Sequence, residues 1–152
     1  MLRGPVWRVS TEGLEDHLED KGRESITGRI FLVDWNIAEA EEYVAQLQLD
    51  GWEVEIESED GCRAYRRIKS DLRDAVVIYL SRLPSHGREL GRGLREIKAT
   101  RDLPIVFVGG TQEAVEKARN KVPDALFITR AELKDALAKL AKIAEGKREY
   151  VC

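Results

Sequence analysis

The chain has few of the residues that usually carry metal or redox chemistry. Its 152 residues include two cysteines, Cys62 and Cys152, and two histidines, His17 and His86. None of the four lies in a metal-ligand spacing, and two isolated cysteines give no disulfide framework. These absences argue against a zinc protein and against a small domain held together by disulfides. We therefore expect no metal and no other cofactor.

Long hydrophobic runs are also absent. The longest apolar runs, such as residues 75–80, have the length of a strand, whereas a helix needs about 20 apolar residues to cross a bilayer. Residues 1–10 lack the apolar core of a signal peptide. We expect a cytoplasmic protein without membrane contact. The 43% hydrophobic content is enough for one domain with a substantial core.

Charge is distributed unevenly along the chain, although the net charge is only −3. Residues 1–61 contain 5 basic and 16 acidic residues, whereas residues 62–101 contain 11 basic and 4 acidic residues. Such a separation can steer a charged partner, and it is also what two solvated faces of a domain would give. The sequence leaves both interpretations open.

From residue 28 onward, short apolar runs alternate with segments of helical period. This order predicts βα units and a parallel sheet. The predicted strands are residues 29–34, 52–58, 75–81, 104–108 and 125–128. The predicted helices are residues 37–49, 61–72, 87–99 and 111–121, and a last helix that follows Thr129, with Glu132 at the capping-box position.

Five βα units in this order predict a three-layer α/β sandwich of the flavodoxin-like type, with sheet order 2-1-3-4-5. Residues 52–58 alternate apolar and acidic side chains, which is typical of an edge strand, whereas residues 75–81 are apolar almost throughout, as a central strand must be. The predicted divisions are an N-terminal arm at 1–27, the domain at 28–146 and a C-terminal tail at 147–152.

Several short motifs lie at matching places in these units. In chain order they are the acidic end of residues 30–34, Gly51-Trp52-Glu53-Val54, Glu59-Asp60-Gly61, residues 74–80 leading to Leu83-Pro84 and Gly87, and residues 102–106. Together they resemble the receiver domain of two-component response regulators, the CheY-like family. The resemblance covers roughly residues 28–143.

The resemblance implies a phosphorylation site at the carboxyl ends of the strands. Receivers hold magnesium with two acidic residues after the first strand, phosphorylate an aspartate after the third, and use a Ser or Thr after the fourth and a Lys after the fifth. Of these five groups the chain keeps Asp34. The other positions hold Trp35, Leu80, Gly109, and Ile128 or Thr129. Leucine has no nucleophile, and Ser81, one residue further, would lack an adjacent base. The resemblance thus implies a pseudo-receiver without phosphoryl transfer.

Three features near this edge have two interpretations each. Arg82 could replace the metal and tether Asp34, or it could be an exposed loop residue. The residues Gly109, Gly110 and Thr111 could bind an anion or nucleotide through backbone N–H groups, or they could form a simple turn. Trp35 could plug the altered site or simply fill the core.

The second and third predicted helices carry most of the basic residues. They are Arg63, Arg66, Arg67, Lys69, Arg73, Arg88, Arg92, Arg95, Lys98 and Arg101. These helices are neighbours in a receiver-like fold, so they could form one positive surface. Nucleic-acid sites usually add exposed aromatic residues, and only Tyr65 lies nearby. An acidic protein partner, which a second copy could supply as a homodimer, is therefore favoured over DNA or RNA.

We interpret the chain as a phosphorylation-independent protein–protein interaction module in signalling or regulation. Receivers commonly bind partners through the fourth helix, fifth strand and fifth helix, here about residues 111–144. The resemblance implies as contacts Val115, Arg119, Arg130 and Lys134. The alternatives are a nucleotide or anion sensor at the strand ends and a nucleic-acid binder using the basic helices. An enzyme is not expected, because no nucleophile–base pair or carboxylate pair can be assembled.

Overall fold

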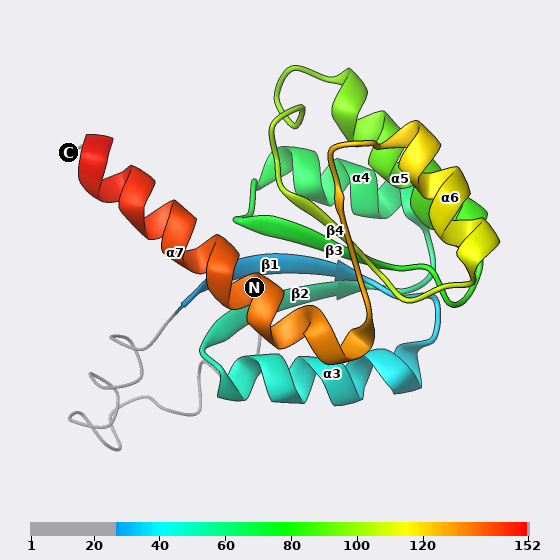
Figure 1. Cartoon of the computed structure of the whole chain (residues 1–152), viewed down its shortest axis with the longest axis horizontal. Coiled ribbons are helices and arrows are strands. Elements are labelled where there is room, and N and C mark those ends of the chain that lie inside the picture. The colour runs from blue at the N-terminus through cyan, green and yellow to red at the C-terminus, as the bar shows by residue number, and fades with distance from the viewer. Residues whose placement is uncertain (1–26, 152) are drawn as a thin grey trace.

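Five parallel strands form one sheet in the order β2-β1-β3-β4-β5 (Figure 1). The computed structural model describes residues 27–151, with side chains for residues 27–143. The strands are β1 (Gly28–Val33), β2 (Trp52–Glu57), β3 (Ala75–Tyr79), β4 (Ile105–Val108) and β5 (Leu126–Ile128). The predicted sheet order is confirmed, with β2 at an edge and β3 in the centre.

Helices connect the strands in the predicted order. They are α3 (Ile37–Leu49), α4 (Gly61–Ser70), α5 (Pro84–Glu96), α6 (Gln112–Lys121), the 3-10 turn η1 (Arg130–Glu132) and α7 (Leu133–Val151). The capping box of Thr129 and Glu132 is present. Helix α5 begins three residues earlier than predicted, because Pro84 suits the first helical turn, where an N–H is not needed. Helix α7 continues through residues 147–151, which the sequence assigned to a tail, and the predicted N-terminal arm lies outside the described residues except for Thr27.

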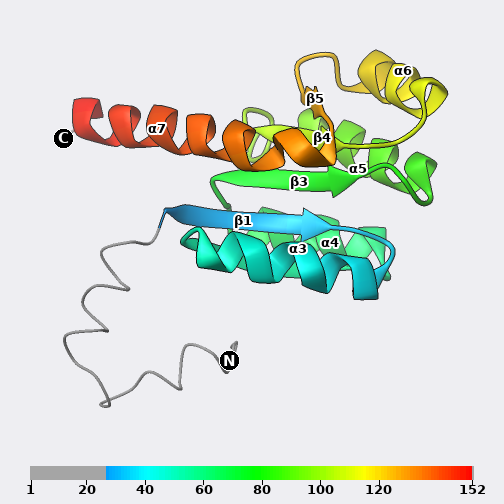
Figure 2. The ribbon, with the colours of Figure 1, turned by 60° about the horizontal axis from the view of Figure 1, so that its bottom comes forward.

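Two layers of helices cover the sheet. Helices α3 and α7 pack on one face and α4, α5 and α6 on the other, and the far end of α7 extends beyond the sheet (Figures 1 and 2). Successive residues of β1 alternate between the two layers, so that Ile30 and Leu32 face α3 and α7 while Phe31 and Val33 face α4. Every residue of β3 is buried. No helix among the described residues is both long and apolar enough to span a membrane.

Glycines in α5 let this helix lie close to the sheet. A Cβ added at Gly87 would lie 2.7 Å from Cγ2 of Ile78, and one added at Gly91 would lie 2.9 Å from Cζ of Phe107. Both distances are shorter than packed side chains allow, so any larger residue would push α5 away from β3 and β4. This packing explains why a segment with three glycines remains helical.

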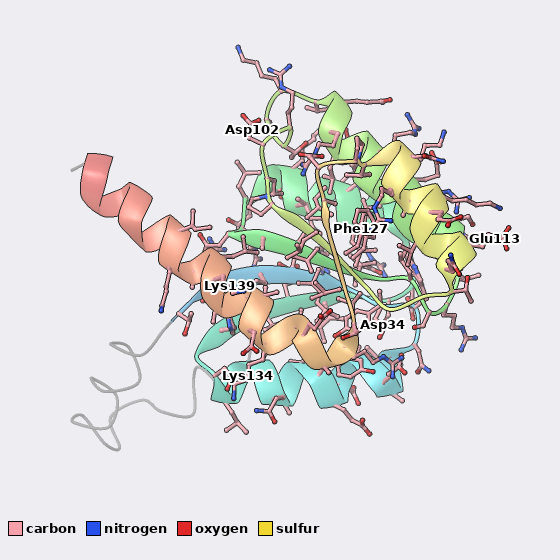
Figure 3. The ribbon with its side chains drawn as sticks, in the orientation of Figure 1. Asp34, Asp102, Glu113, Phe127, Lys134 and Lys139 are labelled. Carbon is pink, nitrogen blue, oxygen red and sulfur yellow. The ribbon has the colours of Figure 1, made fainter. Side chains whose placement is uncertain are left out.

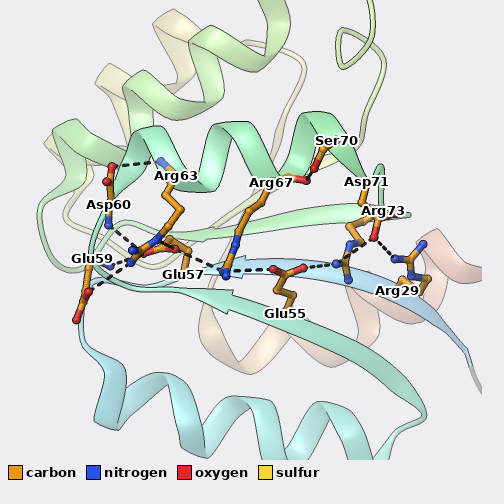
Figure 4. Close-up of polar contacts among 10 residues, drawn as sticks. All are labelled: Arg29, Glu55, Glu57, Glu59, Asp60, Arg63, Arg67, Ser70, Asp71 and Arg73. Carbon is orange, nitrogen blue, oxygen red and sulfur yellow. Dashed lines mark hydrogen bonds and ion pairs between the residues drawn. The ribbon is translucent and has the colours of Figure 1, made fainter. Parts of the chain in front are cut away.

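The acidic residues of β2 pair with the basic residues of α4 (Figure 4). Arg63 donates from Nε and Nη2 to the two carboxylate oxygens of Glu57, at 2.7 and 2.8 Å. Arg67 lies 3.3 Å from Glu55, which also forms an ion pair with Arg73. The separation of charge along the sequence is therefore largely compensated within the fold.

The basic residues of α5 are also engaged. Arg92 pairs with Glu89 and Glu96, and Arg95 pairs with Asp124 at 3.0 Å. Five of the ten basic residues that could form one positive surface over α4 and α5 are therefore paired with acidic residues of the same chain. The exposed basic residues that form no ion pair with another described residue include Arg66, Lys69, Lys98 and Arg101.

Glu57 is the centre of the β2–α4 network. Its carboxylate is almost fully buried, and besides Arg63 it accepts hydrogen bonds from the backbone N–H groups of Glu59 and Asp60, both at 3.0 Å. The hydrogen bonds from Arg63 lower the pKa of Glu57 to about 2, against the opposing effect of burial. The charged form of Glu57 is thus strongly favoured in the folded state.

Replacing Glu57 by glutamine should destabilise the domain by about 2 kcal/mol at pH 7, because the charged partner of Arg63 is lost. The folded pKa of Glu57 lies below its unfolded value, so its contribution is present above about pH 4.5 and is lost as the pH falls towards about 2. Urea unfolding of wild type and Glu57→Gln at several pH values measures this. Glu59→Gln is the matched control, since Glu59 pairs with the same arginine from an exposed position and should stay near wild type. Equal stability of Glu57→Gln and wild type at pH 7 would show that the network contributes nothing.

Candidate functional site

The residues that follow the strands meet at one edge of the sheet. Asp34 follows β1, Leu80 follows β3, Gly109 follows β4 and Thr129 follows β5. The strands are in parallel register, with Val33 beside Ile78, Tyr79 beside Val108 and Val108 beside Ile128. In such folds this carboxyl edge is where ligands bind.

Leu80 is a fully buried hydrocarbon side chain at the centre of this edge. It is 1% exposed and belongs to the core beneath α4, α5 and α6. Glycines make room for it, since a Cβ at Gly110 would lie 2.8 Å from Cβ of Leu80, and one at Gly87 would lie 3.6 Å from its Cδ2. Core packing thus occupies the central position of the edge, and this side chain supplies no nucleophile.

Asp34 is the one charged side chain among these positions. Figure 3 shows its place near the carboxyl ends of the strands. It is fully buried; its Oδ1 accepts the backbone N–H of Asn36 at 3.1 Å, and its Oδ2 has no hydrogen-bond partner among the described residues. The pKa of Asp34 is raised to about 6, mainly by burial and less by the nearby Glu39, while the Asn36 N–H and Arg130 act in the opposite direction. The carboxylate is therefore held in an environment that disfavours its charge.

Two tyrosines and an arginine complete the surroundings of Asp34. Tyr79 is 1% exposed and its hydroxyl has no hydrogen-bond partner; burial raises its pKa. Tyr43 of α3 stacks on Tyr79 with ring centroids 4.8 Å apart. The guanidinium of Arg130 lies 5.4 Å from the Tyr43 ring centroid and 2.6 Å from Glu39. None of these three side chains was predicted from the sequence to lie near Asp34.

Arg82 does not tether Asp34. Its side chain is exposed, and no hydrogen bond or ion pair joins it to Asp34 among the described residues. The tether interpretation was therefore wrong, and Arg82 is an exposed loop residue. The arginine that acts on the charge of Asp34 is Arg130, which follows the fifth strand and so reaches the same edge.

The donors at this edge do not fit magnesium, which the resemblance to receivers implied. Mg²⁺ requires oxygen ligands in near-octahedral geometry, and here Asp34 is flanked by the apolar Trp35 and Leu80. The carboxylate of Glu57, at the end of the neighbouring strand, is already bound by Arg63 and two N–H groups. Among residues 27–143 no group of three or more His, Cys, Asp or Glu residues is arranged to hold a metal ion. We therefore assign no metal-dependent step.

Trp35 points into the core on the α4 and α5 side. It is 8% exposed, and its ring meets that of His86 edge-on with centroids 5.6 Å apart. A Cβ at Gly61, the first residue of α4, would lie 3.8 Å from Cη2 of Trp35. The ring thus fills space beneath the first turns of two helices, which agrees with hydrophobic filling.

The loop between β4 and α6 is a tight turn. Gly109 and Gly110 have φ values of 72° and 92°, in the left-handed region that favours glycine. The N–H of Gly109 donates to the carbonyl of Ile128 at 2.9 Å, and Oγ1 of Thr111 accepts the N–H of Ala114 to cap α6. One of the N–H groups considered for an anion is therefore already used, and anion binding at this turn stays a prediction.

The four residues expected on an interaction surface lie in two places. Val115 is half-buried against the core, and the guanidinium of Arg119 lies 4.6 Å from the ring centroid of Phe127 on β5. Arg130 instead pairs with Glu39 of α3 at 2.6 Å, and Lys134, which Figure 3 labels on α7, lies 3.8 Å from Asp50 at the end of α3. The first pair borders the edge strand β5, and the second pair joins the two helices of the opposite layer.

No family model and no curated protein sequence matches the chain. Solved structures resemble it over most of its length. The response regulator receiver protein from Sinorhizobium medicae WSM419 is 28% identical with a TM-score of 0.60, covering 75% of this chain and 94% of that chain. The receiver domain of sensor histidine kinase PA1611 from Pseudomonas aeruginosa PAO1, which has a magnesium ion in its active site cleft, is 26% identical with a TM-score of 0.60, covering 76% and 98%.

The chemotaxis protein CheY4 of Vibrio cholerae is 18% identical with a TM-score of 0.62, covering 74% of this chain and 97% of that chain. These structural matches each cover about three quarters of this chain and nearly all of the other chain. The chain therefore has the fold of response-regulator receiver domains.

Proposed function

We propose that this chain is a pseudo-receiver, a receiver-fold domain that binds a signalling or regulatory protein without being phosphorylated. The observation that carries the proposal is Leu80, which fills the phosphoacceptor position and is enclosed by Gly87 and Gly110. A receiver without an acceptor has no covalent switch, so its remaining use is the surface that it presents to other proteins.

The surface that supports binding best is the edge of β5 with the adjoining α6. Among the strands of residues 27–151, β5 pairs only with β4, so within this part of the chain its outer edge is open to a partner. Leu126 is 42% exposed there, and Phe127 is half-buried beneath Arg119. We call Val115, Arg119, Leu126 and Phe127 the β5–α6 surface. Leu126 projects from the face of β5 opposite to Phe127, so the open edge carries an exposed apolar residue on one side and an arginine over an aromatic ring on the other. Interfaces favour both kinds of residue.

Phosphorylation is tested directly with acetyl phosphate and magnesium. We expect intact-mass spectrometry to show no added phosphoryl group, because the acceptor position offers only hydrocarbon. A receiver that keeps its acceptor aspartate is the positive control under the same conditions. A phosphoryl group mapped to Asp34 or Ser81 would overturn the proposal.

The stability of the domain should depend on the protonation of Asp34. Its folded pKa of about 6 lies above the ordinary value of 3.8, so the folded state holds this proton more tightly. The stabilisation is complete below about pH 4 and is lost as the pH rises through about 6. Asparagine does not ionise, so the Asp34→Asn variant does not lose this stabilisation. The free energy of unfolding of Asp34→Asn minus that of wild type should therefore increase by about 2 to 3 kcal/mol between pH 4 and pH 7.5.

Urea unfolding at the two pH values measures this difference. Asp135→Asn, which neutralises an exposed carboxylate on α7, controls for the loss of one negative charge. If the free energy of unfolding changes with pH by the same amount in wild type and in Asp34→Asn, the pKa of Asp34 is not raised by folding.

Partner binding is tested by affinity capture from lysate with nuclease added. We expect Leu126→Glu and Arg119→Glu each to reduce recovery of a specific protein by roughly fivefold or more, since both change the β5–α6 surface. Lys139→Glu, an exposed residue on α7, is the control for charge reversal elsewhere. Capture that is equal for all variants, or that disappears on nuclease treatment, argues against this surface.

A further inference from the structure

A cluster of polar side chains lies at the strand ends, on the side of the sheet that α3 and α7 cover. Asp34 continues the alternation of β1 and so faces this layer, and Tyr79 of β3 belongs to the same core cluster. Tyr43 of α3 stacks on Tyr79, and the guanidinium of Arg130 in η1 lies over the ring of Tyr43. With Glu39 of α3, these are the titratable and charged groups that face Asp34.

Two polar atoms of this cluster are buried without a partner. Oδ2 of Asp34 and the hydroxyl of Tyr79 form no hydrogen bond within the described part of the chain, although the two residues are 0% and 1% exposed. A buried polar atom without a partner is costly, and a carboxylate oxygen is the more costly of the two. A cationic donor that reached Oδ2 would remove this cost.

The cation of the cluster is bound elsewhere. Arg130 donates from Nη2 to Oε2 of Glu39, at 2.6 Å. The N–H of Glu39 donates to the side chain of Asn36, and the N–H of Asn36 donates to Oδ1 of Asp34. One residue thus separates the two carboxylates along this chain of hydrogen bonds. Arg130 is near enough to lower the pKa of Asp34 from its position on Glu39. It has two acceptors in its surroundings, and only the outer one is bound.

The outer contact is of a kind that exchanges readily. The side chains of Arg130 and Glu39 are 47% and 25% exposed, and ion pairs this close to solvent contribute little to stability. The inner acceptor offers a stronger interaction, because charge interacts more strongly where water is excluded, but the guanidinium must lose water to reach it. These two effects oppose each other. The ring of Tyr43 gives the guanidinium a favourable surface between the two positions.

We propose that Arg130 is a two-position latch, which either pairs with Glu39 at the surface or turns inward onto Oδ2 of Asp34. In the outer position it joins the start of α7 to α3. In the inner position it neutralises the buried carboxylate and leaves Glu39 free. A cation that takes Glu39 from outside releases Arg130 to the inner position, so the latch connects the surface of α3 with the strand ends. This device is independent of the proposed function.

Carboxyl ¹³C nuclear magnetic resonance of the full labelled chain tests the latch through the titration midpoint of Asp34. Glu39→Gln removes the charge of the outer acceptor and keeps its shape. We expect the midpoint of Asp34 to fall by about one pH unit or more, because the released Arg130 binds the charged form. When Arg130→Gln is also present, Glu39→Gln should lower the midpoint by roughly half as much or less, since only the repulsion of Glu39 is then removed.

The ¹⁵Nε signal of Arg130 provides the second measurement. In Glu39→Gln this signal should shift as Asp34 ionises, by about twice the change seen in wild type or more, because a hydrogen bond to Oδ2 forms. Glu42→Gln, which removes an exposed charge from the same helix, is the matched control and should leave the midpoint of Asp34 close to that of wild type.

Equal lowering of the midpoint by Glu39→Gln with and without Arg130 would overturn the latch, because a fixed arginine and a removed carboxylate act additively. An equal effect of Glu42→Gln would also overturn it, since any charge on α3 would then suffice. The proposed function is tested by phosphorylation and by capture through Leu126 and Arg119, so either can fail without affecting the other.

Discussion

Complete burial of β3 is the constraint on which the rest of this structure depends. A central parallel strand is covered by helices on both faces, so each of its residues must be compatible with a packed interior. Here the hydrocarbon continues one residue beyond the strand, to Leu80, and the glycines of α5 and of the β4–α6 turn close around it. In a fold whose ligands bind at the strand ends, this extension of the core occupies the central position of that edge with packed side chains.

The charged residues follow a second constraint, which is that buried carboxylates need partners. Glu57 ends β2 and Asp34 follows β1, so the two are close along the same edge, yet the pKa of Glu57 is lowered and that of Asp34 is raised. The difference comes from their neighbours. Arg63 and two N–H groups surround Glu57, whereas one oxygen of Asp34 has no donor at all. The first carboxylate stabilises the edge strand, and the second is kept at an energetic cost.

Much of the fold could be predicted from the sequence because its determinants are local. Strand and helix periodicity, the cap at Thr129 and the alternation in β2 each depend on a few adjacent residues, and together they fix the sheet order through the parallel-sheet rules. The positions of Asp34, Leu80 and Gly109 followed from that order. The partners of charged residues did not, because they depend on side chains that reach across elements. Arg63 reaches β2 and Arg130 reaches α3, so neither the charge of the surface over α4 and α5 nor the choice between the two interpretations of Arg82 could be judged from spacing alone.

The same pairing explains why the outer surface of α4 is less positive than its sequence indicates. Arg63 and Arg67 pair with Glu57 and Glu55 of β2, and Arg63 also reaches the exposed Glu59. The acidic residues of the strand therefore compensate the charge of a helix that they do not themselves form. Glu57→Gln would affect both elements, since it removes the buried partner of Arg63 and leaves this arginine with Glu59. The stability of the edge strand and the charge of α4 are thus linked through one arginine.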